Sequence, residues 1–322
     1  MVDPSQVTKV KLNNGIEMPV IGLGTWQSPH EDVYEAVKTA IEVGYRHIDC
    51  AYCYGNEVPV GRAIKDAISE GKVKREDLFV VSKVWLTFFT RERVREGLKR
   101  SLTNLGLDYL DLYLVHWPIS FQQVDEKIFP ADANGLAIDG KVDYLDTWKG
   151  MEDVLKDGLV KSIGVSNFNS EQVTRVLNNS SVKPVTNQVE SHPYLAQKQL
   201  LKFCREKGIP LTAYSPLGNP GSAYNTNPNK KNILNDTLVS KLATKYKKTA
   251  GQILIKFQAQ RGVIVIPKSV KRDRIVENIQ IFDFELNADE ITALENLDFG
   301  YRSCPGDPGA DLLPNYPFHI PY

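Results

Sequence analysis

The sequence has few cysteines, no excess of charge of either sign and no long apolar run. Its four cysteines are too few for a disulfide scaffold in a chain of 322 residues. Lys and Arg together number 39, as do Asp and Glu, so no net charge favours nucleic acid or an anionic membrane as a partner. No stretch approaches the roughly 20 apolar residues that span a bilayer, and residues 1–6 lack the basic and apolar regions of a signal peptide. We therefore expect a cytoplasmic protein with reduced thiols.

Cys50 and Cys53 have the spacing of a redox-active pair. Neither a second cysteine pair nor a histidine pair accompanies them, as a zinc site would require. We expect these two residues to be structural thiols, and we expect no bound metal.

Short apolar runs alternate with amphipathic segments along the chain. The expected strands are residues 20–23, 45–49, 78–82, 110–115, 160–165, 185–189, 210–213 and 263–266. The expected helices are residues 32–43, 58–69, 91–105, 145–156, 170–177, 196–206, 236–247 and 287–297. Residues 7–12 and 16–18 predict a hairpin ahead of this repeat. Periodicity alone leaves open a doubly wound sheet and a closed barrel.

The polar residues favour the barrel. They follow successive expected strands at the C-terminal ends, namely Asp49, Ser82, Lys83, His116, Ser166, Asn167, Gln188 and Tyr214. A barrel collects those ends on one rim, where its active sites lie. A doubly wound sheet usually carries a G-x-G-x-x-G loop, and here Gly22-Leu-Gly24 lacks the third glycine. We expect one α/β domain over residues 1–322, a (β/α)8 TIM barrel with an N-terminal β-hairpin.

Three long irregular segments carry Gly, Pro and aromatic residues without a helical period: residues 118–143, 217–233 and 298–322. Such loops in a compact domain are usually functional or disordered. Because all three flank the polar rim, we expect them to form pocket walls over it. A loosely ordered terminus is the alternative for the last of them.

Four polar residues near three consecutive strand ends could together donate a proton to a substrate. Tyr54 follows Asp49, and Lys83 and His116 end the next two strands. A phenol is a poor proton donor near neutral pH, but a neighbouring ammonium lowers its pKa and a carboxylate holds the ammonium in place. Tyr54 is thus a candidate general acid tuned by Lys83 and Asp49. A neutral His116 could donate a hydrogen bond to a carbonyl oxygen.

Each of these residues also has an ordinary structural role open to it. A strand-end aspartate often caps a helix, a tyrosine often packs, and a lysine is often solvated. The residues alone therefore leave both an active site and a set of unrelated structural groups possible.

Residues 44–61 read G-Y-R-H-I-D-C-A-Y-C-Y-G-N-E-V-P-V-G, which resembles the N-terminal signature of the aldo-keto reductase superfamily. The likeness extends over residues 21–26, 159–168, 187–194 and 316–318, and it is nearest to aldose and aldehyde reductases and related hydroxysteroid dehydrogenases. It implies a catalytic tetrad of Asp49, Tyr54, Lys83 and His116. Relatives with Glu at the histidine position reduce a steroid carbon–carbon double bond, so the resemblance implies a carbonyl reductase here.

The resemblance also implies NADPH/NADP+ as cofactor, bound without a Rossmann motif. The residues implied for it are Gly24, Thr25, Trp26, Asp49, Ser166, Asn167, Gln188, Tyr214, Ser215, Leu217, Asn219, Lys268, Ser269, Val270, Arg274, Glu277 and Asn278. Lys268, Ser269 and Arg274 near a helix start suit the 2′-phosphate, although they could equally be the basic first turn of a solvated helix. Relatives carry an Asp that helps to hold the cofactor where Gly221 stands, which predicts faster cofactor exchange.

The residues implied for the substrate are mostly aromatic: Trp26, Cys53, Tyr54, Trp85, His116, Trp117, Phe129, Tyr224, Tyr301 and Cys304. Such walls suit a small hydrophobic aldehyde, a ketone or a steroid-like carbonyl. We expect Trp148 to pack in the core instead. Two other functions stay open: an oxidative hydroxysteroid or polyol dehydrogenase, and a non-catalytic cofactor-binding protein. A monomer is what the resemblance implies.

Overall fold

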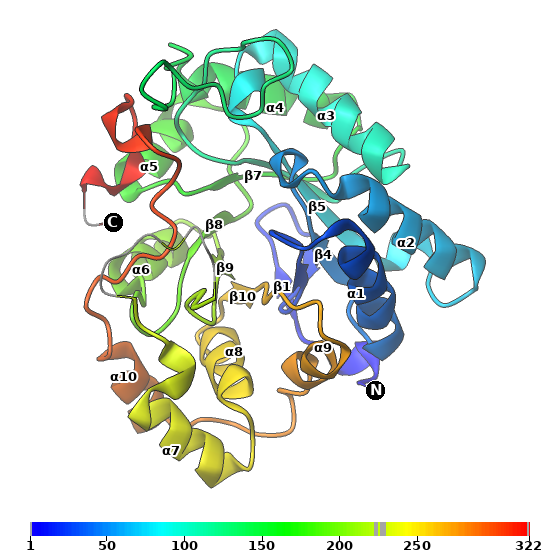
Figure 1. Ribbon diagram of the computed structural model, residues 1–322, viewed down its shortest axis with the longest axis vertical. Coiled ribbons are helices and arrows are strands. Elements are labelled where there is room, and N and C mark those ends of the chain that lie inside the picture. Colours follow the sequence, from blue (N-terminus) through cyan, green and yellow to red (C-terminus); the bar gives the residue numbers. More distant parts are fainter. Residues whose placement is uncertain (1, 222–224, 226–229, 321) are drawn as a thin grey trace.

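The computed structural model describes residues 2–221, 225, 230–320 and 322. Eight parallel strands form one curved sheet in the order β10-β9-β8-β7-β6-β5-β4-β3, enclosed by helices (Figure 1). The strands are β3 (Leu23–Gly24), β4 (His47–Asp49), β5 (Phe79–Val84), β6 (Leu112–Val115), β7 (Ile163–Ser166), β8 (Asn187–Glu190), β9 (Leu211–Tyr214) and β10 (Ile264–Val265).

Parallel bridges join the two ends of this sheet. Ile21 pairs with Val265, and Gly24 pairs with Lys268, so the sheet closes between β3 and β10. A Cβ atom on Gly24 would lie 2.8 Å from the carbonyl oxygen of Ile266, so only glycine permits this approach. The expected (β/α)8 barrel is therefore confirmed.

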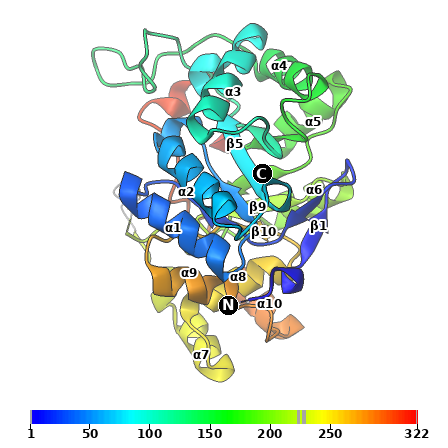
Figure 2. The same cartoon turned by 90° about the vertical axis from the view of Figure 1, so that its right-hand side faces the viewer.

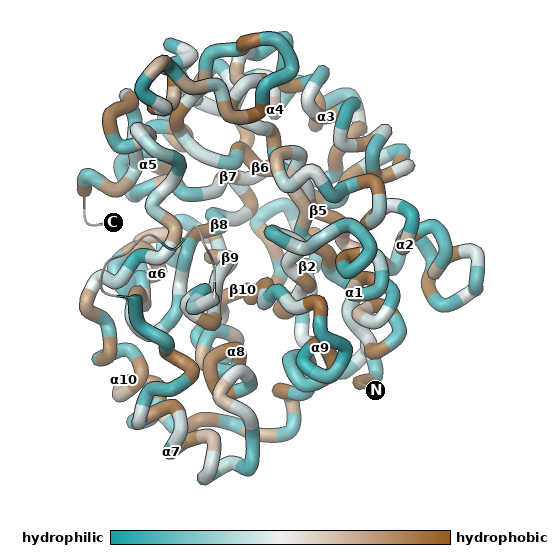
Figure 3. Tube along the Cα trace, in the orientation of Figure 1, coloured by the Kyte–Doolittle hydropathy of each residue, from teal (hydrophilic) through white to brown (hydrophobic). Residues whose placement is uncertain are grey.

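Ten helices lie among the described residues, and most of them surround the barrel. They are α1 (His30–Val43), α2 (Glu57–Ser69), α3 (Arg91–Leu105), α4 (Tyr144–Lys156), α5 (Ser170–Asn179), α6 (Lys198–Glu206), α7 (Thr237–Tyr246), α8 (Ala250–Gln260), α9 (Arg272–Ile279) and α10 (Ala288–Glu295). Figure 2 shows α1 and α2 packed side by side in front of the strands, and Figure 3 shows hydrophobic and hydrophilic residues alternating along the helices. No helix in the described part of the chain is long and apolar enough to cross a membrane.

The N-terminal hairpin closes the end of the barrel opposite the polar rim. Its strands, β1 (Lys9–Lys11) and β2 (Glu17–Pro19), pair antiparallel as expected. Leu12 and Met18 pack against strand residues that include Phe79 and Leu112, all of them buried. This apolar plug fills one end of the barrel and leaves the C-terminal strand ends for polar side chains.

One expected helix boundary and one omission need correction. The helix expected from residue 196 begins at Lys198, because Gln197 has a left-handed backbone (φ 55°) that a helix cannot include. Helix α8 was not predicted. Residues 252–258 of it are all buried, so it lacks the polar face that reveals an amphipathic helix.

The C-terminal segment packs onto the barrel, so the alternative of a loosely ordered terminus is wrong for its described residues. Tyr301, Ser303, Ala310 and Pro317 are buried. Trp148 is buried in the core, as expected.

Candidate active site

Lys83 is the centre of the expected tetrad. It lies on β5 with no exposed surface, and its Nζ donates to Asp49 Oδ1 at 2.5 Å and to the carbonyl oxygen of Cys50 at 2.7 Å. The same Nζ lies 3.3 Å from the hydroxyl oxygen of Tyr54, which belongs to the short 3-10 helix η2 (Tyr52–Tyr54). One ammonium therefore contacts both the carboxylate and the phenol, as the sequence predicted.

The ion pair of Lys83 and Asp49 is fully buried and needs further hydrogen bonds to be stable. Gln188, the second residue of β8, donates from Nε2 to Asp49 Oδ2 at 2.7 Å. Thr25 donates its hydroxyl to the backbone oxygen of Asp49 at 2.8 Å. Both carboxylate oxygens thus have a partner, and Asp49 is held from the far side of the barrel.

The pKa of Tyr54 differs in direction from the sequence-based expectation. Burial raises this pKa well above its ordinary value, and the negative charge of Asp49 raises it further. Spacing alone could not weigh these effects against the ammonium of Lys83. Tyr54 therefore keeps its proton near neutral pH, which is the form that a proton donor requires.

His116 follows β6 and stands beside Tyr54. Its ring meets the rings of Tyr54 and Trp85 edge-on, with centroids 5.8 and 5.2 Å apart, and its backbone oxygen accepts from Asn167 Nδ2 at 3.0 Å. Burial lowers the pKa of His116 well below its ordinary value, and the charge of Lys83 adds to the effect. The imidazole is neutral and can donate only one N–H.

Several residues expected to bind a cofactor form one hydrogen-bonded network on the next strand ends. Ser166 donates its hydroxyl to the backbone oxygen of Gln188 at 2.8 Å. Tyr214 donates its hydroxyl to Asn167 Oδ1 at 2.8 Å. Because Asn167 also reaches His116 and Gln188 reaches Asp49, this network is continuous with the tetrad.

A buried carboxylate that the sequence analysis did not single out holds the C-terminal segment in place. Glu190, the last residue of β8, accepts from the backbone N–H and the hydroxyl of Ser303 at 2.8 and 2.6 Å and from the backbone N–H of Cys304 at 3.0 Å. His192 Nε2 lies 2.9 Å from the same carboxylate. The position of Glu190 at a strand end within the matched stretch 187–194 was the signal available in the sequence.

Comparison with known proteins decides the family. The model of the aldo/keto reductase family matches residues 20–298. The chain belongs to that family. It is 47% identical to aldo-keto reductase family 1 member A1 of Gallus gallus, over 97% of this chain and 98% of the relative, and 44% identical to the Homo sapiens protein of the same name with the same coverage.

Solved structures support the assignment of this chain to the aldo/keto reductase family. The aldose reductase from Schistosoma japonicum is similar with a TM-score of 0.91 and 42% identity, covering 98% of this chain and 100% of that one. A Bombyx mori aldo-keto reductase, solved in complex with NADP, gives a TM-score of 0.88 and 39% identity with the same coverage.

The anion site expected in this aldo/keto reductase lies after β10 and at the start of α9. Lys268 donates from Nζ to the backbone oxygen of Gln27 at 3.1 Å, so it reaches back across the closing edge of the barrel. Arg274 and Glu277 lie in α9, which begins at Arg272, and the sequence implied a helix start near these residues. Lys268 and Arg274 are exposed, so both cations are open to a ligand.

Aromatic residues of the aldo/keto reductase surround His116 on one side. Trp85 packs edge-on against Phe129, with centroids 5.2 Å apart, and its indole N–H donates to the backbone oxygen of Ile128 at 2.6 Å. Phe129 is 53% exposed. The loop of residues 118–143 thus forms a wall beside the tetrad, and Trp117 meets Phe318 of the C-terminal segment at 5.5 Å.

One of the residues expected to bind substrate, Tyr301, is not brought to the tetrad. Tyr301 is buried, and its ring contacts are with His192, Tyr194 and Phe299. Its hydroxyl accepts from Asn225 Nδ2 at 3.0 Å, so Tyr301 contacts the segment after β9 and not the tetrad. Tyr224 lies outside the described residues. Cys304 does lie beside the expected cofactor residues, with Sγ 3.6 Å from Asn219 Nδ2 and 3.8 Å from the hydroxyl of Ser215.

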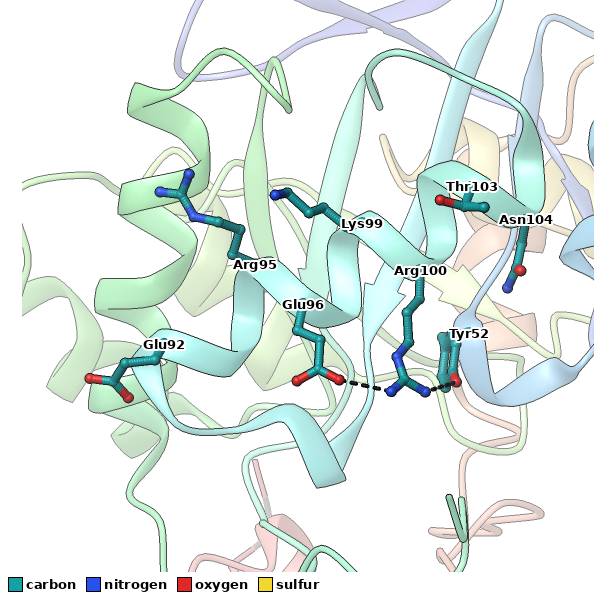
Figure 4. A pocket seen from close by; sticks show the side chains of 8 residues that line it. All are labelled: Tyr52, Glu92, Arg95, Glu96, Lys99, Arg100, Thr103 and Asn104. Atoms are coloured by element: carbon teal, nitrogen blue, oxygen red, sulfur yellow. Dashed lines mark hydrogen bonds and ion pairs between the residues drawn. The ribbon is translucent and has the colours of Figure 1, made fainter. Parts of the chain in front are cut away.

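A polar groove on the outer side of α3 is separate from these groups (Figure 4). It is lined by Tyr52, Glu92, Arg95, Glu96, Lys99, Arg100, Thr103 and Asn104. Arg100 donates to Glu96, to Glu126 and to the hydroxyl of Tyr52. Its charge is thus compensated within the protein, and we assign this groove no catalytic role. No cluster of three or more metal-ligating side chains occurs in the described part of the chain.

Proposed function

We propose that this aldo/keto reductase reduces aldehydes and ketones to alcohols with NADPH, using Tyr54 as the general acid. The observation that carries the proposal is the position of Lys83 Nζ, within hydrogen-bonding distance of both Asp49 and the hydroxyl of Tyr54. When bound, the nicotinamide supplies the hydride that reaches the carbonyl carbon. We assign the proton transfer and the orientation of the carbonyl group to side chains of the protein.

Tyr54 gives its proton to the carbonyl oxygen as negative charge develops there. The phenolate that remains lies beside the Lys83 ammonium, which stabilises it by about the strength of a charge-assisted hydrogen bond. Asp49 holds the ammonium of Lys83 in place through their buried ion pair. The raised pKa of Tyr54 in the resting protein keeps the proton available, and the ammonium of Lys83 stabilises the phenolate once the proton has left.

His116 orients the carbonyl group. Because the imidazole is neutral, it can direct one N–H at the carbonyl oxygen without adding a positive charge that would compete with Lys83. The edge contacts with Tyr54 and Trp85 fix the plane of its ring. Substrate oxygen would then lie between the phenol and the imidazole.

The residues present fit a nicotinamide dinucleotide. Ser166, Asn167 and Gln188 offer amide and hydroxyl groups that are already ordered beside Asp49, and Tyr214 offers a ring at the next strand end. Lys268 and Arg274 offer two exposed cations for a phosphate group. We assign the cofactor to this line of residues.

The substrate is a small hydrophobic aldehyde, ketone or steroid-like carbonyl compound. Trp85, Trp117 and Phe129 form apolar walls, and His116 and Tyr54 are the polar groups that meet the carbonyl oxygen. We further propose that the protein acts in the cytoplasm as a monomer.

NADPH oxidation, followed at about 340 nm where the reduced nicotinamide absorbs, tests the function directly. The panel contains aromatic, aliphatic and steroid carbonyl compounds and the corresponding alcohols with NADP+. Turnover of hydrophobic carbonyls supports the proposal. Preferred oxidation of alcohols would favour the dehydrogenase alternative, and tight NADPH binding without turnover would favour a non-catalytic protein.

Replacing Lys268 by Met should raise the KM for NADPH about ten- to a hundredfold, because a charge-assisted hydrogen bond to the extra phosphate is lost. The KM for NADH, which lacks this phosphate, should change by less than about twofold. Lys271→Met, an exposed lysine three residues later, is the matched control. Equal losses for NADPH and NADH would contradict the assignment of Lys268.

Replacing Gly221 by Asp should slow NADP+ release about three- to tenfold, by restoring the acidic group that relatives use to hold the cofactor. The substitution is sterically free, since a Cβ atom at Gly221 would have no atom within 4 Å. Stopped-flow release of NADP+ measures the rate, with Gly221→Asn as an uncharged control. Release from the wild type no faster than from Gly221→Asp would refute the idea.

A further inference from the structure

Cys53 immediately precedes Tyr54 on η2, and its Sγ lies 3.6 Å from Nδ1 of His116. The proposed reaction uses His116 and Tyr54 but gives this thiol no task. Cys53 is half-buried and His116 is buried, so the contact is largely sheltered from water. A sulfur atom at this distance from a ring nitrogen is within hydrogen-bonding range.

Three forms of this contact are chemically possible. They are a thiol donating to Nδ1, an Nδ1–H donating to sulfur, and an ion pair of thiolate and imidazolium. Burial raises the pKa of the Cys53 thiol well above its ordinary value and lowers that of the His116 imidazole well below its own. Both groups are therefore neutral near pH 7, which excludes the ion pair.

The two neutral forms have opposite consequences for the other ring nitrogen. A neutral imidazole carries a single N–H, so the bond made by one nitrogen sets the state of the other. If sulfur donates to Nδ1, then Nε2 carries the proton and can donate to a carbonyl oxygen. If Nδ1 donates to sulfur, then Nε2 presents a lone pair, which repels that oxygen.

We propose that Cys53 is a positioning residue whose S–H donates to Nδ1 of His116 and keeps the imidazole proton on Nε2, where it meets the substrate oxygen. This inference rests on the proposed function, which requires a donor at that place. The ring contacts of His116 with Tyr54 and Trp85 add to it, because they hold the ring in the orientation that brings Nδ1 to sulfur.

Without the thiol of Cys53, the single imidazole proton of His116 can lie on either ring nitrogen. Without a donor at Nδ1, part of the protein population holds the proton on the wrong nitrogen and cannot orient the carbonyl group. We expect Cys53→Ala to lower kcat/KM about two- to tenfold, the range of one neutral hydrogen bond. Cys53→Ser, which retains a donor at the same position, should recover most of the loss.

The decisive readout is the tautomer of His116, observed by 15N NMR in protein labelled at histidine and saturated with NADP+. The chain has five histidines, and His116→Asn identifies the signal. The expected result is an Nε2–H tautomer in the wild type and in Cys53→Ser, and a mixture in Cys53→Ala. Cys204→Ala, which removes a buried thiol in α6, is the matched control and should leave the tautomer unchanged.

An Nδ1–H tautomer or an imidazolium in the wild type would overturn the inference, as would a tautomer that does not respond to Cys53→Ala. Failure of Cys53→Ser to restore kcat/KM would show that packing of the sulfur, not its proton, matters. These results differ from failure of the proposed function, in which the wild type turns over no carbonyl compound. The tautomer can then still be measured in the cofactor-free protein.

Discussion

Replacing Tyr54 by Phe should lower kcat for carbonyl reduction by at least about a hundredfold, the usual contribution of a positioned general acid. The substitution removes only the hydroxyl group that lies 3.3 Å from Lys83 Nζ, and the ring remains to pack against His116. NADPH affinity should stay within about twofold of the wild type, because the phenol is not assigned to the cofactor. Steady-state kinetics and a fluorescence titration with NADPH measure the two quantities.

Tyr52 offers the matched control for this experiment. It lies two residues earlier on the same 3-10 helix, and its hydroxyl accepts from Arg100 on the outer side of α3. Tyr52→Phe removes the same group and should leave kcat within about twofold. If Tyr54→Phe retained more than about a tenth of the wild-type kcat, another proton donor would have to be found.

Replacing Lys83 by Met should lower the free energy of unfolding by about 3–5 kcal/mol, because it leaves the buried carboxylate of Asp49 without its ionic partner. It should also lower kcat by at least about a hundredfold, since the phenolate of Tyr54 loses the adjacent positive charge. Urea unfolding, compared at equal m-values, and steady-state kinetics measure these effects.

A double variant separates the two roles of Lys83. In Asp49→Asn with Lys83→Met no uncompensated charge is buried, so most of the lost stability should return. Activity should not return, because the ammonium is still missing. A double variant as unstable as Lys83→Met alone would show that the lysine stem, and not its charge, supports the barrel.

Much of this site could be predicted because it lies on regular strand ends. The expected strands placed Asp49, Lys83 and His116 at successive C-terminal ends, and closure of the barrel brings such ends together. The apolar runs are clear because parallel strands are buried on both faces, as all six residues of β5 are. Local patterns and one topological rule therefore bring these three residues to one rim, and the resemblance to the aldo-keto reductases implies that they form a tetrad with Tyr54.

The features that were missed depend on tertiary contacts. Helix α8 has too little polar surface to show a period, and Tyr301 turns to His192 and Tyr194 although its neighbours in sequence approach the rim. The direction of the pKa shift of Tyr54 is set by burial and by the charge of Asp49. Residue spacing in the sequence therefore predicts none of these three features.

The bonds from Glu190 to Ser303 and Cys304 also set an order of events during synthesis. The last barrel strand, β10, ends at Val265, whereas Ser303 and Cys304, which donate to Glu190, follow nearly forty residues later. At about 5–20 residues per second, a ribosome needs a few seconds to make that difference. During this time the carboxylate of Glu190 lacks its bonds from Ser303 and Cys304, so we expect completion of the rim to be a late step of folding on the ribosome.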